Sequence, residues 1–167
     1  MMRAVFVYVT LCICLAVCVF AAVPKGKETM VAPINDSMSN ARIDRILNEV
    51  SDDVEGQPGL WQFTYRDVQM MCVTDESHDR MRVISARAAV EDLSHDELMS
   101  CMEANFDRTL DARYCVYKGK LWCAFIHPLR SLTDRQFRSA LDQVAGIHES
   151  FGHTYSSGDL IFNPSEE

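Results

Sequence analysis

The sequence predicts an α+β fold in which helices pack on one face of an antiparallel sheet, in the order α-β-β-β-α-β-β-α. Three segments repeat apolar residues at helical spacing, and five shorter ones are rich in strand-forming residues or alternate apolar with polar residues. The strand patterns occur as a run of three and then a pair, with short connections. This arrangement is typical of antiparallel neighbours rather than βαβ units.

Each expected helix has a recognisable boundary. The first ends at the acidic and glycine-rich stretch 51–59, and its apolar face comprises Ile43, Ile46, Leu47 and Val50. The second begins at a capping box of Ser94 and Glu97, and its apolar stripe comprises Leu98, Met102 and Phe106. The third begins at a capping box of Thr133 and Gln136, and Gly152 takes the position after its last residue.

The strands are expected at 61–65, 68–74 and 80–86, followed by a hairpin of 112–117 and 120–126 around Lys118-Gly119. A two-residue loop places Cys115 opposite Trp122 and Tyr114 opposite Cys123. Cys115 and Cys123 then lie on opposite faces of the sheet and cannot form a disulfide.

The two faces of this hairpin differ in polarity. The expected core face comprises Ala112, Tyr114, Val116, Leu121, Cys123 and Phe125. The opposite face comprises Arg113, Cys115, Tyr117, Lys120, Trp122, Ala124 and Ile126. Half of that second face is apolar, which indicates a partner site or a dimer interface.

Two arginines extend this candidate surface. Arg80 and Arg82 share one strand face in an acidic chain, with Arg87 nearby, and could bind a carboxylate or an anionic partner. The alternative is that they pair with Asp79 or Glu91. The predicted partner-binding residues are Trp122, Tyr117, Cys115, Ile126, Arg80 and Arg82.

The N-terminus predicts export. Residues 1–22 have one arginine, a long apolar run and small residues at Ala21-Ala22, which is the pattern of a signal peptide cleaved after Ala21. An uncleaved anchor and a lipoprotein cleavage at Cys18 are the alternatives. A flexible linker is expected at 23–40, the folded domain at 41–155 and a tail at 156–167, with one possible strand at Asp159–Phe162.

The sequence predicts a protein that is not an enzyme and has no metal or cofactor. The net charge of −8 disfavours nucleic acid as a partner. Four cysteines follow the leader, each within an apolar pattern, and buried free thiols are favoured over disulfides. His148 and His153 are five residues apart, so they do not share the helix face that a zinc-protease motif requires.

A diffuse resemblance covers about residues 41–155. The segments Asp79-Arg80-Met81-Arg82, Asn105-Phe106, Asp111-Ala112-Arg113-Tyr114, Leu121-Trp122, His127-Pro128-Leu129, Gln143-Val144 and Phe151-Gly152 resemble the YbjN-like family. These bacterial proteins are described as putative sensory transduction regulators, and their fold is similar to class I type III secretion chaperones. The resemblance implies a small, non-enzymatic, dimeric binding protein. The export leader departs from the cytoplasmic secretion chaperones.

These observations lead to a functional expectation. We expect an exported protein- or peptide-binding module, chaperone-like or regulatory, that forms a homodimer in the periplasm or outside a bacterial cell. The alternative is a structural or envelope-stress protein that an uncleaved leader anchors to the inner membrane.

Overall fold

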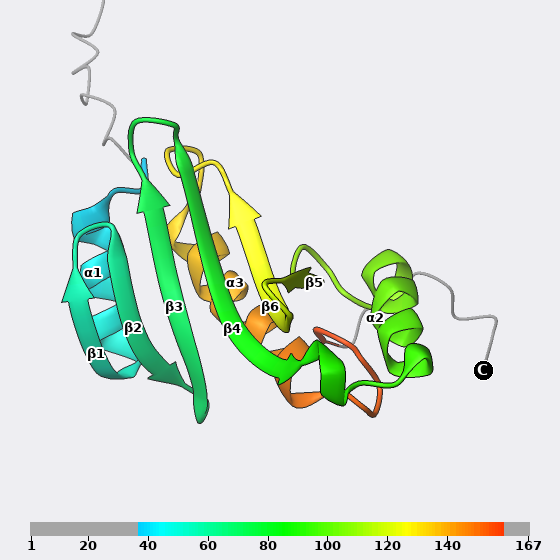
Figure 1. The fold of residues 1–167 in the computed structure, drawn as a ribbon. Coiled ribbons are helices and arrows are strands. Elements are labelled where there is room, and N and C mark those ends of the chain that lie inside the picture. The colour runs from blue at the N-terminus through cyan, green and yellow to red at the C-terminus, as the bar shows by residue number, and fades with distance from the viewer. Residues whose placement is uncertain (1–36, 159–167) are drawn as a thin grey trace, which may run out of the picture. The chain divides into compact units, whose positions relative to one another are not determined.

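The computed structural model describes residues 37–158 and confirms the predicted α+β class (Figure 1). The predicted signal peptide, most of the linker and the possible strand Asp159–Phe162 lie outside the described residues. The elements are α1 Asn40–Val50, β1 Asp52–Gln57, β2 Leu60–Tyr65, β3 Val68–Asp75, β4 Arg80–Ala89, the short helix η1 Val90–Asp92, α2 His95–Asp107, β5 Arg113–Tyr117, β6 Lys120–His127 and α3 Asp134–Glu149.

The strands form one antiparallel sheet in the order β1-β2-β3-β4-β6-β5. The predicted order lacked β1, because the acidic stretch after α1 was expected only to end the helix. That expectation is wrong. β1 is an edge strand with an irregular register between Asp52 and Glu55, and most of its side chains face water. An edge strand of this kind is held by backbone pairing and shows no apolar alternation, so the sequence pattern could not reveal it.

Two tight turns set the register of the hairpins. Arg66-Asp67 connects β2 to β3 and Lys118-Gly119 connects β5 to β6, and all four residues have positive φ between 50° and 71°. Such turns match the twist of the strands that they join. Tyr114 therefore pairs with Cys123 and Cys115 with Trp122, as predicted. The four cysteines at 72, 101, 115 and 123 are free; the first, second and fourth are buried as expected, whereas Cys115 is only partly buried.

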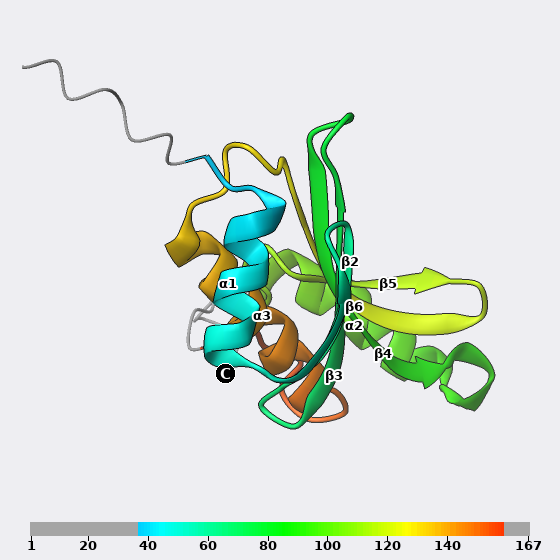
Figure 2. The ribbon, with the colours of Figure 1, turned by 90° about the vertical axis from the view of Figure 1, so that its left-hand side faces the viewer.

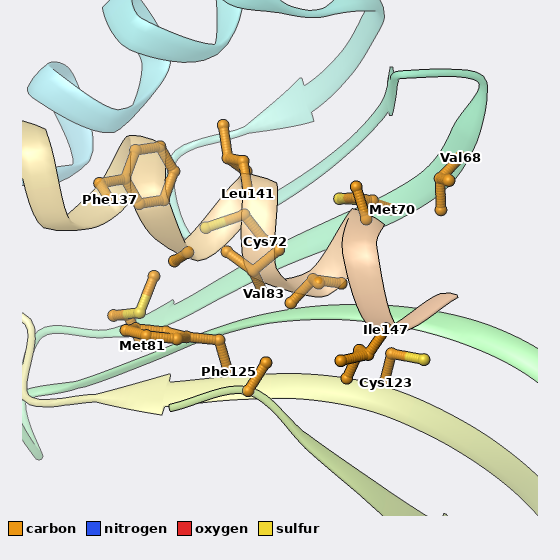
Figure 3. Close-up of a cluster of buried hydrophobic side chains, with 14 of the residues drawn as sticks. Val68, Met70, Cys72, Met81, Val83, Cys123, Phe125, Phe137, Leu141 and Ile147 are labelled. Carbon is orange, nitrogen blue, oxygen red and sulfur yellow. The ribbon is translucent and has the colours of Figure 1, made fainter. Parts of the chain in front are cut away.

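The core lies between the sheet and two helices. Figure 2 shows α1 and α3 on one side of the sheet. Side chains of β3, β4 and β6 pack there against α3, and the buried cluster in Figure 3 includes Met70, Cys72, Val83, Cys123, Phe125, Phe137, Leu141 and Ile147. Trp61 is also buried, and its Nε1 donates to Asp44 Oδ1 at 3.0 Å.

The predicted N-terminal caps of α2 and α3 are present, but the C-terminus of α3 differs from the prediction. The Ser94–Glu97 and Thr133–Gln136 capping boxes both form. α3 ends at Glu149 with Ser150 as its C-cap, two residues before Phe151, the last helical residue that the position of Gly152 suggested. Gly152 instead takes a φ of 83° within the turns that follow the helix.

α2 packs differently from the prediction. It buries only Cys101 and Ala104, whereas Met102 and Phe106 of the predicted apolar stripe are 45% and 83% exposed. These side chains are exposed because α2 lies beyond the β5 edge of the sheet and contacts the sheet only through its buried side (Figure 1). Val116, expected in the core, is 53% exposed because the hairpin tip extends past α1 and α3 (Figure 2).

Asn105 of α2 occupies part of the free edge of β5. Its Nδ2 donates to the Tyr114 carbonyl at 2.9 Å, and its Oδ1 accepts from the Tyr114 amide at 2.8 Å. The side chain thus supplies the two hydrogen bonds that a neighbouring strand would make. It also joins α2 to the sheet.

We expect Asn105→Ala to lower the free energy of unfolding by about 1–3 kcal/mol, because both backbone groups of a buried residue lose their partners. Urea denaturation measures this change. Asn48→Ala is the matched control, since its amide donates to Asp44 on an exposed helix surface and its loss should be close to neutral. Equal effects of the two substitutions would contradict the role of Asn105.

Candidate protein-binding surface

The sheet face opposite α1 and α3, here called the outer face, is turned toward the viewer in Figure 1. The strand pairing places all six residues of the predicted partner site on it. Arg82 lies opposite Ile126, and Cys115 lies opposite Trp122. Arg80 lies two residues before Arg82 on β4, and Tyr117 lies two residues after Cys115 on β5, so both residues share the same face. Ile126 and Tyr117 are 57% and 61% exposed.

The outer face extends further than the sequence analysis predicted. Pairing from β2 to β6 aligns Leu60, Val73, Arg82 and Ile126 in one row across four strands. The next row contains Met71 and Ile84, which line a shallow hollow of about 190 Å³ with Trp122. The two-residue loop at Arg66-Asp67 was the signal that could have identified these residues, because it sets the β2–β3 register.

The charges of Arg80 and Arg82 on the outer face can interact with a partner. Neither Arg80 nor Arg82 forms an ion pair with any residue in the range 37–158. Asp79, one expected partner, instead accepts the backbone N–H of Arg130 at 2.8 Å. Arg87 was expected beside these two arginines, and that expectation is wrong. It lies on the other side of the sheet with its guanidinium 4.7 Å from the centre of the Phe151 ring.

Trp122 and Cys115 form the apolar part of the face near its β5 edge. The indole Nε1 of Trp122 donates to the Tyr117 carbonyl at 3.2 Å, which leaves the ring available for contact. Burial raises the pKa of the Cys115 thiol, and nearby Arg82 offsets this only in part. The thiol therefore stays protonated at neutral pH and is suited to packing rather than nucleophilic attack.

The other three thiols of residues 37–158 are buried. Burial raises the pKa of Cys101 to about 11 and that of Cys123 to about 12, and it raises the pKa of Cys72 as well. A nucleophilic cysteine needs its thiolate, which such pKa values disfavour. Thiol catalysis therefore has no support among the cysteines of the described chain.

The histidines noted in the sequence do not form one site. His148 Nδ1 lies 2.8 Å from the hydroxyl of buried Ser85, whereas His153 is exposed in the turns after α3. Within residues 37–158, no group of three His, Cys, Asp or Glu side chains is arranged to hold a metal ion. α3 ends at Glu149, so His153 does not lie on the same helix as His148.

His148 should make stability depend on pH. Burial lowers its pKa below the ordinary value of 6.5, and the neighbouring Arg87 guanidinium adds to this effect. The unfolded chain then binds the proton more readily than the folded chain. The free energy of unfolding should therefore be constant above the unfolded pKa, fall as the pH drops through 6.5, and level off below the folded pKa.

Urea denaturation at pH 8 and pH 5 measures this dependence. His148→Gln keeps a hydrogen-bonding group near Ser85 and removes the titration, so the loss between the two pH values should be smaller in the variant. An identical loss in both proteins would show that other groups cause it.

Comparison with known proteins supports the fold. The sequence matches no protein-family model, and no curated protein sequence matches it. The structure is similar to a solved chain described as "Structure of the HopA1-SchA Chaperone-Effector Complex", with a TM-score of 0.50 and 10% sequence identity. The match covers 67% of this chain and 92% of that chain. The chain therefore shares the α+β fold of that solved chain from a chaperone–effector complex.

Among residues 37–158, no helix is long and apolar enough to cross a membrane.

Proposed function

We propose that this chain is a non-enzymatic module that binds a protein or peptide partner through the outer face of its sheet. One observation carries this proposal: the outer face combines apolar side chains with two arginines that form no ion pair with the acids of residues 37–158, and α1 and α3 cover only the opposite face. A solvated sheet surface needs no such row of apolar groups. The similarity to a chain from a chaperone–effector complex is consistent with this role.

The composition of the surface defines the chemistry of the partner. Ile126, Trp122 and Met71 offer apolar contact, while Arg80 and Arg82 attract carboxylates. A partner segment with apolar residues beside Asp or Glu would match both. We further propose that the protein is a homodimer and a member of the YbjN-like family, as the sequence resemblance implies.

Trp122→Asp tests the surface assignment. The substitution places a negative charge in the apolar part of the outer face. We expect it to weaken self-association and partner capture. Ala41→Asp is the matched control, because it adds the same charge on the exposed side of α1. Native mass spectrometry gives the oligomeric state, and co-purification from the expressing host compares capture by the variants. Unchanged behaviour of Trp122→Asp in both measurements would exclude this surface.

We also propose that the leader directs export and is cleaved after Ala21. The alternative, a membrane-tethered envelope protein, keeps the leader. Mass spectrometry of the mature N-terminus separates them: a chain beginning at Ala22 supports cleavage, and one beginning at Met1 supports the anchor.

A further inference from the structure

Charged and apolar side chains are separated along the strands of the outer face. Arg80 and Arg82 lie at the start of β4, and neither forms an ion pair with an acid of residues 37–158. The hollow that Met71, Ala86 and Trp122 line lies farther along the strands. Arg80 and Ala86 are about 20 Å apart along β4. A ligand that contacts both the arginines and the hollow must therefore run along the strands.

The acid closest to these arginines in the strand pairing has other partners. Asp75 lies opposite Arg80 in the pairing of β3 with β4. Its carboxylate accepts from the Ser77 hydroxyl at 2.6 Å and from the His78 amide at 3.0 Å, and His78 Nδ1 lies 2.6 Å from it. Arg80 donates to the Asp79 backbone carbonyl at 3.3 Å, which leaves further N–H groups of its guanidinium for a ligand.

The inner strands of the outer face have few backbone groups left for a ligand. β2, β3, β4 and β6 each have a paired strand on both sides, so their N–H and C=O groups bond within the sheet. An extended peptide laid over Met71 and Trp122 would bury its own backbone groups without partners, which is costly. A helix satisfies these groups internally. A helical ligand therefore suits this face better than an extended one.

We propose that the partner segment is an amphipathic α-helix that lies along β3, β4 and β6, with its C-terminal turn over Arg80 and Arg82. This inference rests on the proposed function and specifies the conformation and direction of the partner. A helix is about 10 Å wide and covers three strands that are about 4.8 Å apart. A helix of about 13 residues spans the distance from Arg80 to the hollow.

Charge sets the direction of the bound helix. The last turn of a helix has C=O groups without intrahelical partners and carries the negative end of the helix dipole. Both features favour the guanidinium groups of Arg80 and Arg82. Asp or Glu side chains in that turn destabilise an isolated helix, but here the same arginines would neutralise them. Apolar side chains of the preceding turns then contact Met71, Ile84 and Trp122.

Addition of a strand to an edge of the sheet is the alternative form of binding. β1 carries Asp52, Asp53 and Glu55, which repel an acidic segment. At the β5 edge, Asn105 already bonds the backbone N–H and C=O of Tyr114. Both edges therefore suit an acidic partner less well than the outer face.

Three labelled peptides of identical composition, with blocked ends and about 14 residues each, test the proposal by fluorescence anisotropy. The first has leucines at i, i+3, i+4 and i+7 and glutamates in its last turn. The second has the glutamates in its first turn, and the third alternates leucine with polar residues as a strand does. We expect the first to bind about fivefold more tightly than either of the others. The second is the more helical peptide in isolation, so helicity alone would give it the higher affinity.

Removing the two charges tests the direction of the helix. Arg80→Gln/Arg82→Gln should bind the first and second peptides with nearly equal affinity, because the apolar contacts remain and the charge preference is lost. Arg135→Gln is the matched control on an exposed position of α3, and it should keep the wild-type preference.

Equal or tighter binding of the second or third peptide would overturn the proposal. If Trp122→Asp still weakened that binding, the outer face would remain the site and only the conformation or direction of the partner would be wrong. Failure of all three peptides to bind would also overturn the proposal, while partner capture by Trp122→Asp would still decide the proposed function. Binding that Trp122→Asp leaves unchanged would exclude the outer face as well.

Discussion

Gln143→Leu should lower the free energy of unfolding by about 2–5 kcal/mol, because it leaves two backbone donors without an acceptor. Gln143 lies on α3 and is only 5% exposed. Its Oε1 accepts from the Asp111 amide at 2.8 Å and the Ala112 amide at 3.0 Å. One side chain thus positions the segment that leads into β5, and hence the β5 part of the outer face. Urea denaturation followed by circular dichroism measures the loss.

Two further variants separate this role from general side-chain effects. Gln143→Glu keeps an acceptor for both amides, so we expect a smaller loss than with leucine. Gln62→Leu makes the same chemical change on an exposed strand position and should be close to neutral. If Gln143→Leu were no worse than Gln62→Leu, the amide contacts would contribute little to stability.

Arg82→Glu should reverse the charge preference of the outer face. Arg82 is exposed, unpaired with any described acid, and opposite Ile126, so a bound peptide would place its own charges beside it. We expect the wild type to bind an apolar peptide flanked by glutamates about tenfold more tightly than the same peptide flanked by lysines. The variant should prefer the lysine-flanked peptide. Fluorescence anisotropy of labelled peptides at low salt measures both affinities.

Arg135→Glu is the control for this experiment. It changes the net charge of the protein by the same amount on an exposed position of α3, away from the outer face. Its peptide preference should remain that of the wild type. A similar reversal in Arg135→Glu would show that net charge, rather than the outer face, selects the peptide.

The parts of the fold that follow from sequence are those with strong local signals. The capping boxes of α2 and α3 and the Lys118-Gly119 turn are formed by neighbouring residues, and the structure has them as predicted. β1 and the packing of α2 depend on contacts between distant segments. Asp52–Gln57 is a strand only because β2 is available to pair with it. The α2 stripe is exposed because the helix meets the sheet only at its edge.

Only the part of the outer face that lies within one hairpin could be predicted from the sequence, because its residues are close together in the chain. Alternation within the hairpin identified Trp122, Cys115, Tyr117 and Ile126 as neighbours on one face. Leu60, Met71, Val73 and Ile84 join them only through the pairing of β2, β3 and β4. The direction of Arg87 was missed because the register shifts between Ala86 and Ala88, an irregularity that the sequence pattern does not show.

Hydroxyl-radical footprinting tests the central claim, that the outer face holds the partner, most directly. The protein is labelled alone and with the tighter-binding peptide, and oxidation is quantified residue by residue. We predict that the peptide protects Trp122, Tyr117 and Met71 on the outer face, while oxidation of Met99 and Met102 on α2 stays unchanged. Protection of Met99 and Met102 with no change at Trp122 would place the binding site on α2 and contradict the proposal.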